Sequence, residues 1–332
     1  MSRPRPALVF GVLAALAAAL VVASLLVGPA RLPPGESLAA LLGGAPPAEA
    51  LIMRELRLPR AALGLLIGAG LGLSGAALQG YLRNPLAEPG LVGVSGSAAL
   101  GAVIALYSGL SAAFPLALPL MALGFGLGAA LLVQGLAGAG SSSITLILAG
   151  LAVSSLASAL TALALNLAPN PFAASEIVHW LLGSLVDRSL PQLWLAGPFL
   201  VAGMALLLTL GRSLDALTLG EDAAASLGVS LPGARIRVVL GVALATGAGV
   251  AVAGAIGFVG LVAPHLLRPL VGGRPSALLP ASALGGAILL LAADVAVRLI
   301  APERDLKLGV VTALVGAPLF LHLVWRSRRT LT

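Results

Sequence analysis

The chain has 332 residues, of which 59% are hydrophobic and only 9% are charged, and its mean hydropathy is +1.08. This composition leaves too little polar surface for a soluble globular protein, so we expect a membrane protein. The net charge of +7 comes from scattered arginines and one lysine rather than from a basic stripe, which argues against nucleic acid as a partner. The absence of cysteine excludes disulfides, thiolate metal sites and thiol catalysis.

Ten apolar segments are candidates for membrane spans, since a helix needs about twenty apolar residues to cross the roughly 30 Å hydrocarbon layer. They lie at 7–28, 61–82, 92–113, 116–137, 144–167, 193–211, 236–256, 257–272, 277–300 and 308–325. The first lacks a small-residue cleavage site, so we expect it to be retained. The eighth is short and contains Pro264, which predicts a broken helix packed against protein. The sequence thus predicts an all-α, polytopic membrane protein with a single transmembrane domain over residues 1–332.

An even number of spans places both termini on one side, and the arginines near each terminus mark that side as cytoplasmic. The excess of basic residues on this side is small, because Arg54, Arg57 and Arg60 fall on the outer side in the same topology. We therefore expect these outer cations to have a function that outweighs the usual orientation bias.

Glycines repeat at four-residue spacing within the second span, at Gly64, Gly68 and Gly72. This spacing places them on one helix face, where the missing side chains let another helix backbone approach closely. We interpret the repeat as a packing surface inside a helix bundle.

The stretch from Arg83 to Gly90 holds two prolines, a glycine and a pair of opposite charges, which predicts a rigid non-helical connector. Just after it, the sequence Gly-Val-Ser-Gly around Ser95 resembles the nucleophile motif of rhomboid intramembrane proteases, and His265 is a candidate base. An intramembrane serine protease is therefore one alternative function. Because such short motifs are frequent in a glycine-rich chain, capping or packing of the next helix is the favoured role of Ser95.

Asp294 and Arg298 lie one helical turn apart near the outer end of the ninth span, where ionisable residues are unusual. A proton-coupled carrier would use such a buried acid and is the second alternative. A relay needs several buried acids, however, and only Asp294 qualifies, which weakens the carrier interpretation. A self-neutralising ion pair without a transport function is the other interpretation of these two residues. The histidines at 179, 265 and 322 have none of the spacings of a metal site, and no metal is expected.

ATP hydrolysis by this chain is excluded, because its only lysine, Lys307, follows a leucine and cannot belong to a Gly-x-x-x-x-Gly-Lys phosphate loop. We expect no cofactor bound by this chain. Any ATP and magnesium would be held by a separate ATPase subunit.

The polar stretch at 213–230 is a candidate docking element for such a partner. Gly220 and Gly228 are expected to end two short helices, with Ser213 capping the first and two acids in the first turn of the second. A helix lying on lipid would carry basic residues, so a groove in a partner protein suits this acidic stretch better. The alternative is a plain surface loop with helical turns.

Several ordered motifs together resemble the permease family of bacterial importers for iron-siderophores, heme and vitamin B12, the type II ATP-binding-cassette (ABC) importers. They lie at 83–90, 93–96, 220–228, 254–265 and 308–318. The resemblance covers nearly the whole chain and implies a ten-helix permease fold that catalyses no bond chemistry of its own. The residues that match structural positions of the motifs are Asn84, Pro85, Glu88, Pro89, Gly90, Pro264 and His265.

The resemblance also implies the partners: a second copy of the chain in a homodimer, two cytoplasmic ATPase subunits, a periplasmic or lipid-anchored substrate-binding protein, and the lipid of the bacterial inner membrane. The residues that it implies for ATPase coupling are Asp215, Leu219, Gly220, Glu221, Asp222, Ala225, Leu227 and Gly228. Those implied for docking of the binding protein are Arg57, Arg60 and Arg298.

The cargo implied first by the resemblance is a ferric siderophore, with heme or cobalamin as alternatives. The chain departs from the family pattern at one place. Where many relatives have Glu-Leu-Pro before the last motif, this chain has Asp305-Leu306-Lys307. Without the proline, the resemblance determines neither the shape of that outer loop nor the class of cargo.

Overall fold

The computed structural model of the protein describes residues 6–138, 143–301 and 306–328, and these contain helices and no strand. The elements are α1 (Pro6–Leu26), α2 (Pro34–Leu42), α3 (Pro47–Leu51), the π-helix η1 (Ile52–Arg57), α4 (Leu58–Tyr81), the 3-10 helix η2 (Pro89–Val92), α5 (Val94–Tyr107), α6 (Leu110–Ala113), α7 (Ala117–Ala137), α8 (Ser143–Asn166), α9 (Pro171–Leu181), α10 (Leu190–Leu208), α11 (Gly211–Leu217), α12 (Glu221–Ser226), α13 (Leu231–Ala253), α14 (Val259–Leu267), α15 (Pro275–Ile300) and α16 (Leu308–Arg328). The predicted all-α class is confirmed. Of the departure from the family pattern at 305–307, Asp305 lies outside the described residues. Leu306 and Lys307 lead directly into α16, and the carbonyl of Lys307 accepts hydrogen bonds from the amides of Val310 and Val311.

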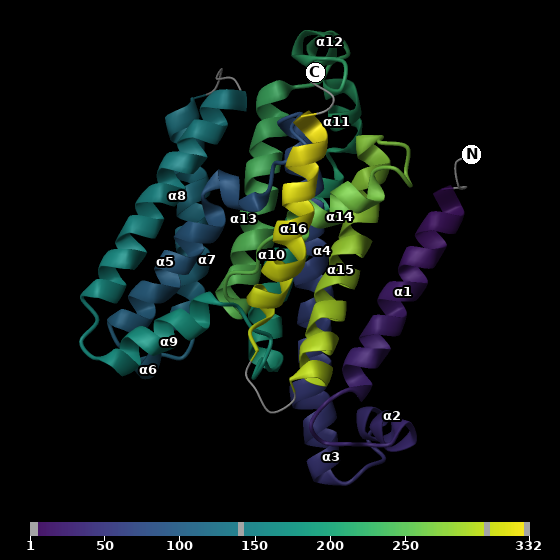
Figure 1. Ribbon diagram of the computed structural model, residues 1–332, viewed down its shortest axis with the longest axis vertical. Helices are drawn as coiled ribbons and strands as arrows, with labels where there is room; N and C mark the ends of the chain where they lie inside the picture. The colour runs from purple at the N-terminus through teal and green to yellow at the C-terminus, as the bar shows by residue number, and fades with distance from the viewer. Residues whose placement is uncertain (1–5, 139–142, 302–305, 329–332) are drawn as a thin grey trace.

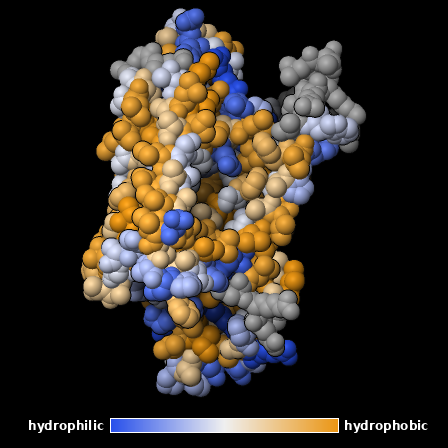
Figure 2. All heavy atoms as spheres, turned by 60° about the vertical axis from the view of Figure 1, so that its left-hand side comes forward, coloured by the Kyte–Doolittle hydropathy of each residue, from blue (hydrophilic) through white to orange (hydrophobic). Residues whose placement is uncertain are grey.

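Each of the ten predicted spans corresponds to a helix. Within the described ranges, seven helices are long and apolar enough to cross a membrane: α1, the continuous helix Pro47–Tyr81, α7, α8, α10, α13 and α15. Of the other three spans, α5 and α16 are shorter apolar helices, and α14 has nine residues. The face shown in Figure 2 is covered by hydrophobic residues over most of its height, with hydrophilic residues gathered toward the two ends, as expected for a protein that lipid surrounds.

The long helices run side by side along the vertical axis of the bundle (Figure 1). The N-terminal end of α1 and the C-terminal end of α16 lie at the same end as α11 and α12, which we call the inner end. The short helices α2 and α3 lie at the opposite, outer end. Because both described chain ends lie on one side, the arrangement agrees with an even number of crossings.

The helix α4 packs against α15 through the predicted glycine repeat. An added Cβ at Gly68 would overlap the backbone of Gly286, and one at Gly72 would overlap the carbonyl of Ser282. One turn further along α4, Gly75 lies equally close to the backbone of α14. The predicted packing surface is therefore confirmed, and it joins α4, α14 and α15 by backbone contact.

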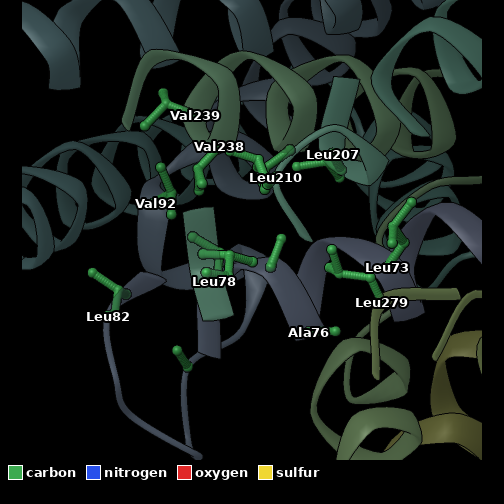
Figure 3. Packing of buried hydrophobic residues seen from close by; sticks show 14 of the residues in the cluster. Leu73, Ala76, Leu78, Leu82, Val92, Leu207, Leu210, Val238, Val239 and Leu279 are labelled. Atoms are coloured by element: carbon green, nitrogen blue, oxygen red, sulfur yellow. The ribbon is translucent and has the colours of Figure 1, made fainter. Parts of the chain in front are cut away.

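A large apolar cluster fills the inner half of the bundle around the second half of α4 (Figure 3). Members from five of its helices include Leu73, Ala76 and Leu78 of α4, Leu207 of α10, Val238, Val239 and Val242 of α13, Leu267 of α14, and Leu278 and Leu279 of α15. These side chains are buried and aliphatic, so the inner ends of the helices are held by close packing.

The predicted break of the eighth span at Pro264 is wrong, because Pro264 lies inside α14, which is continuous from Val259 to Leu267. The break lies instead at the non-helical residues 254–258, where the seventh and eighth predicted spans meet. Gly254 and Phe258 both have positive φ, at +74° and +66°. The carbonyl of Ala253, just before the break, accepts a hydrogen bond from the amide of Ser184 at 2.7 Å. The non-helical backbone therefore packs against protein, which is the condition for irregular structure at membrane depth.

Two outer regions contain structure that the hydropathy pattern did not predict. The third span, predicted over 92–113, is interrupted where Gly109 adopts φ +70° between α5 and α6. The loop expected at 168–192 contains α9, whose first turn is capped by the side chain of Asn170, which accepts a hydrogen bond from the amide of Ala173 at 2.9 Å.

Candidate functional site

The connector between α4 and α5 is held by hydrogen bonds from its own polar side chains and from α14. The Asn84 side chain accepts a hydrogen bond from the amide of Leu86 at 2.9 Å, which forms a tight turn ahead of the exposed Pro85. Arg268, at the end of α14, donates to the side chain of Gln79 at 2.6 Å, and Gln79 donates to the carbonyl of Ala87 at 3.3 Å. These contacts give the predicted rigid connector a physical basis.

The second half of the connector packs into the bundle. The ring of Pro89 is buried and lies so close to Gly260 of α14 that no side chain fits there. The carbonyl of Gly90 accepts a hydrogen bond from the Ser154 hydroxyl of α8 at 3.1 Å. Burial raises the pKa of the Glu88 carboxyl between these two contacts. The connector thus ties α14 to α8.

Within α14, the two remaining motif residues differ in exposure. Pro264 is buried inside the helix, and His265 next to it is only partly buried. Because Pro264 does not form the break, its role in this fold is that of a packed residue of α14.

The 213–230 segment forms the two short helices expected from the sequence, α11 and α12. Gly220 precedes α12 with φ +107° and Gly228 follows it with φ +82°, conformations that glycine adopts at least cost. Ser213 does not cap the first helix, because α11 begins at Gly211 and places this serine in its interior. The segment ends at Ser230, whose side chain caps α13 by accepting a hydrogen bond from the amide of Gly233.

The two short helices differ in what they touch. Leu214 and Leu217 of α11 are buried in the bundle, whereas α12 buries only Ala224. Leu219 and Leu227, on either side of α12, are 68% and 65% exposed. Glu221, Asp222 and Ala225, which the resemblance implies for ATPase coupling, are exposed too, and both acids lie in the first turn of α12. The solvent-facing surface of this segment is therefore an acidic patch flanked by two exposed leucines.

Asp215 is the exception, because its carboxylate points into the bundle. It accepts a hydrogen bond from the backbone amide of Ser276, at the start of α15, and forms an ion pair with Arg274, both at 2.8 Å. Burial alone would raise the pKa of Asp215, but the hydrogen bonds from Ser276 and Arg274 outweigh it and hold this pKa below its ordinary value.

Arginines with a spacing of three residues fix three different helices at the outer end. Arg54 donates hydrogen bonds to the carbonyls of Ala40 and Leu41 at the C-terminus of α2. Arg57 is buried and donates to three carbonyls at and after the C-terminus of α1, those of Leu25, Leu26 and Ala30. Arginine at such a position satisfies carbonyls that have no partner within their own helix.

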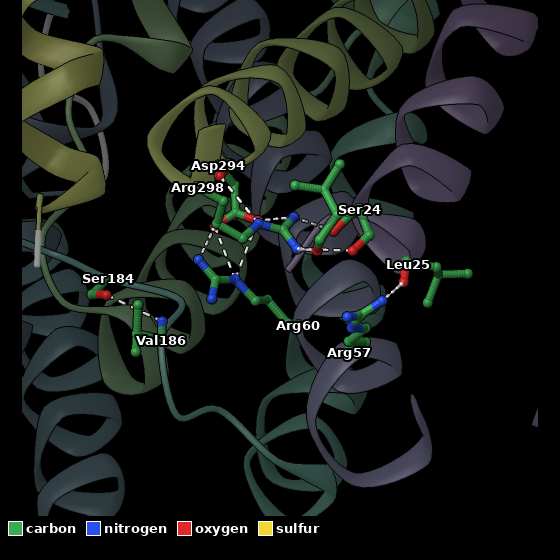
Figure 4. A network of polar contacts seen from close by, with 9 residues as sticks. Ser24, Leu25, Arg57, Arg60, Ser184, Val186, Asp294 and Arg298 are labelled. Atoms are coloured by element: carbon green, nitrogen blue, oxygen red, sulfur yellow. Dashed lines mark hydrogen bonds and ion pairs between the residues drawn. The ribbon is translucent and has the colours of Figure 1, made fainter. Parts of the chain in front are cut away.

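The third of these arginines, Arg60, reaches Asp294 of α15 with an ion-pair distance of 2.7 Å (Figure 4). The same carboxylate pairs with Arg298 at 2.6 Å, which confirms the ion pair predicted from the sequence. Arg298 also donates to the hydroxyl of Ser24 at 2.7 Å and to the carbonyls of Ser24 and Val27. One buried carboxylate thus binds two guanidinium groups and joins α4, α15 and α1.

Arg57, Arg60 and Arg298, the predicted docking residues, meet at one place on the outer end. They line a cavity of about 290 Å³ together with Asp187 and Arg188. Arg57 and Arg298 also hold the end of α1, a structural function that the sequence did not predict. In the sequence, the arginines at 54, 57 and 60 indicated an unusual site. No sequence pattern predicted that Arg60 would pair with Asp294, which lies 234 residues further along the chain.

A model of the FecCD transport family matches residues 16–326. The chain belongs to the FecCD transport family. The Fe(3+) dicitrate transport system permease protein FecD of Escherichia coli (strain K12) is 40% identical over 278 residues, which cover 83% of this chain and 86% of FecD. The vitamin B12 import system permease protein BtuC of Vibrio cholerae is 41% identical over 280 residues, 84% of each chain. A solved structure described as a metal-chelate type ABC transporter, in an inward-facing conformation, matches with a TM-score of 0.86 and 34% identity over 97% of this chain and all of the other.

Membership of the FecCD family confirms the resemblance seen in the sequence. The chain is a multi-pass membrane protein and the permease of a type II ABC importer. Proteins of this family are transport subunits and not enzymes, which excludes the protease interpretation of Ser95 and His265. Import driven by an ATPase partner likewise excludes the proton-coupled carrier built on Asp294.

Proposed function

We propose that this permease moves a ferric siderophore across the bacterial inner membrane, with both termini in the cytoplasm. The observation that supports the choice of a ferric chelate is the similarity to FecD, which is named for ferric dicitrate. The structural match to a metal-chelate type transporter agrees with this choice, but it fits heme and cobalamin equally, because both are metal chelates. The relatives named for ferric dicitrate and for vitamin B12 are almost equally similar, at 40% and 41% identity. Cobalamin and heme therefore stay as the alternative cargoes.

The ATPase partner docks on the 213–230 segment in this proposal. The exposed leucines at 219 and 227 flank α12 at the inner end, and a protein groove would bury both. Acidic residues of α12 disfavour an anionic lipid surface as its partner. ATP and magnesium are held by the ATPase subunit, and this chain binds neither.

The substrate-binding protein docks at the outer cavity lined by Arg57, Arg60 and Arg298. The four arginines of this cavity outnumber its acids, Asp187 and the adjacent Asp294, so the site keeps an excess of positive charge. Acidic side chains on a partner complement such a rim, and charge pairing there speeds encounter and fixes register. A homodimer would present the cavity twice, in agreement with a binding protein that has two lobes.

The second copy covers apolar surface that this chain leaves open. Side chains that are more than half exposed include Leu148, Leu151 and Leu156 of α8 and Leu314 and Leu321 of α16. Within a single copy of the chain, only 22% of the most apolar stretch of α8 is buried. Membrane lipid covers whatever part of this surface the dimer does not.

Reconstitution of the permease with its ATPase and binding protein in proteoliposomes tests the proposal. ATP-dependent uptake is compared for a ferric siderophore, heme and cobalamin, and preference for the ferric siderophore is expected. Preference for either other cargo would replace the iron proposal and leave the importer intact. Leu219→Asp together with Leu227→Asp should prevent ATPase assembly, whereas Leu42→Asp, an exposed leucine on α2 at the other end, should not.

A further inference from the structure

The first turn of α15 is capped by a residue of another helix. Its own N-cap residue, Arg274, has no side-chain acceptor and makes no capping hydrogen bond, and Pro275 follows it. The free amide of Ser276 is satisfied instead by the carboxylate of Asp215 on α11. Asp215 thus does for α15 what an N-cap serine or aspartate ordinarily does within one helix.

Two apolar contacts hold α11 against the same elements. Leu214 is fully buried and lies over Gly80 near the end of α4, where an added Cβ would come within 3.2 Å of the leucine side chain. Gly211 faces Ser276, and a Cβ there would lie 3.2 Å from the Cβ of that serine. The helix α11 therefore packs on the inner ends of α4 and α15, while α12 faces solvent.

The helix α15 runs the full height of the bundle from this contact. It packs on α4 by backbone contact at Gly286 and Ser282, and near its outer end Asp294 binds Arg60 and Arg298. One continuous helix therefore joins the two ends of the bundle, and beyond Pro280 its backbone contacts with α4 leave it little room to move independently. At its first turn, the Ser276 amide and the Arg274 side chain both bind Asp215, which belongs to the segment proposed to meet the ATPase.

We infer that Asp215 is a positioning residue that couples the ATPase-docking segment to α15 by capping the first turn of that helix. The inference rests on the proposed docking of the ATPase at 213–230. It assigns to Asp215 a function inside the permease rather than a contact with the ATPase, consistent with a side chain that is only 20% exposed. The ion pair with Arg274 contributes little, because the arginine side chain is 73% exposed and its charge is screened by solvent.

Three variants distinguish the contribution of the helix cap from the contribution of the ion pair. Asp215→Asn keeps an acceptor oxygen for the amide of Ser276, Asp215→Ala removes it, and Arg274→Ala removes only the ion pair. Glu176→Ala, at an exposed acid of α9 outside the docking segment, is the matched control. Each variant is assembled with the ATPase and binding protein in proteoliposomes, and cargo uptake per ATP hydrolysed is measured.

Asp215→Ala should assemble with the ATPase and hydrolyse ATP, but uptake per ATP should fall about fivefold or more, and amide exchange in the first turn of α15 should be about fivefold faster. Asp215→Asn, Arg274→Ala and Glu176→Ala should stay within about twofold of the wild type. Unchanged uptake per ATP in Asp215→Ala, or an equal loss in Arg274→Ala and Glu176→Ala, would overturn the inference.

A disulfide between α11 and α15 provides the decisive second measurement, since the chain has no cysteine of its own. In an Asp215→Ala background, Gly211→Cys and Ser276→Cys place two Cβ atoms near disulfide distance. Oxidation should restore uptake per ATP and reduction should remove it again, and absence of this rescue would overturn the inference. Failure of the proposed docking itself is recognised separately, because the ATPase would then assemble with the Leu219→Asp and Leu227→Asp protein.

Discussion

Arg60 and Asp294 lie 234 residues apart in the sequence, and their side chains form an ion pair at 2.7 Å between α4 and α15. The carboxylate of Asp294 is 2% exposed and also binds Arg298. Its removal would leave two guanidinium groups without an anion in a poorly hydrated site, which costs about 3–5 kcal/mol when a buried pair is broken.

Asp294→Asn is therefore expected to lower the stability of the purified permease by about that amount, seen as a clear fall in the midpoint of thermal unfolding in detergent. Asp222→Asn, at an exposed acid of α12, is the control and should leave the midpoint unchanged within error. Equal midpoints for the two variants would show that the network does not stabilise the fold.

Charge at the outer cavity is tested with two arginines of the same cluster. Arg60 lines the cavity and Arg54 does not, although both lie on the same outer helix. Arg60→Gln should weaken association of the binding protein at low salt, and the difference from wild type should shrink as salt is added. Arg54→Gln should bind like the wild type. An equal effect of both substitutions, or none from Arg60→Gln at low salt, would refute docking at this cavity.

Glycine packing between α4 and α15 predicts opposite effects of the same substitution at two positions. Gly72→Ala would drive a methyl group into the carbonyl of Ser282 and should destabilise the permease by about 1–3 kcal/mol. Gly124→Ala, on α7, has no neighbouring atom within 4 Å of the new Cβ and should be neutral or stabilising by up to about 1 kcal/mol. The midpoints of thermal unfolding of the two variants test this prediction. Destabilisation of equal size in both would argue against backbone contact at Gly72.

Stability is expected to depend on pH through Glu88, whose pKa is raised by burial. A raised folded-state pKa means that the stabilising contribution is complete below the unfolded value of about 4.3 and is lost as pH rises through the folded value. Glu88→Gln, which never ionises, should therefore unfold at a higher temperature than the wild type near about pH 7, with a gain that shrinks toward about pH 4. A constant difference across this range would contradict the assignment.

Gly220 should tolerate no side chain, for a reason of backbone conformation alone. Its φ is +107°, and no atom lies within 4 Å of an added Cβ. Gly220→Val is expected to cost roughly 1–3 kcal/mol locally and to shift α12, so that ATP hydrolysis continues while uptake falls. Gly35→Val, in equally open space on α2 but without positive φ, is the control. Normal uptake per ATP in Gly220→Val would count against a coupling role for α12.

Features that depend on local sequence were predictable. The apolar segments located all ten spans, the spacing of Gly64 and Gly68 predicted close helix packing, and the two glycines of the 213–230 segment, Gly220 and Gly228, adopt positive φ on either side of α12. Each of these follows from chain geometry within a few residues, because a helix span, a helix face and a positive φ are local properties.

Features that join distant segments were not predictable. The hydrogen bond from Ser276 to Asp215 spans 61 residues, and the Arg60 to Asp294 pair spans 234. A break was predicted at Pro264, but the non-helical residues lie at 254–258, where the seventh and eighth spans meet. A proline is tolerated within α14, so local propensity did not decide the position of the break.

The helix that runs without interruption from Pro47 to Tyr81 has 35 residues. At 1.5 Å per residue it is about 52 Å long, against a hydrocarbon layer of about 30 Å. Even with an ordinary tilt, several turns at its N-terminal end must stand in the headgroup region and the water beyond it. The arginines at 54 and 57 therefore lie on a rigid helical extension beyond the lipid, so a partner that docks at this end of the bundle would contact a preformed helix before it reached the membrane surface.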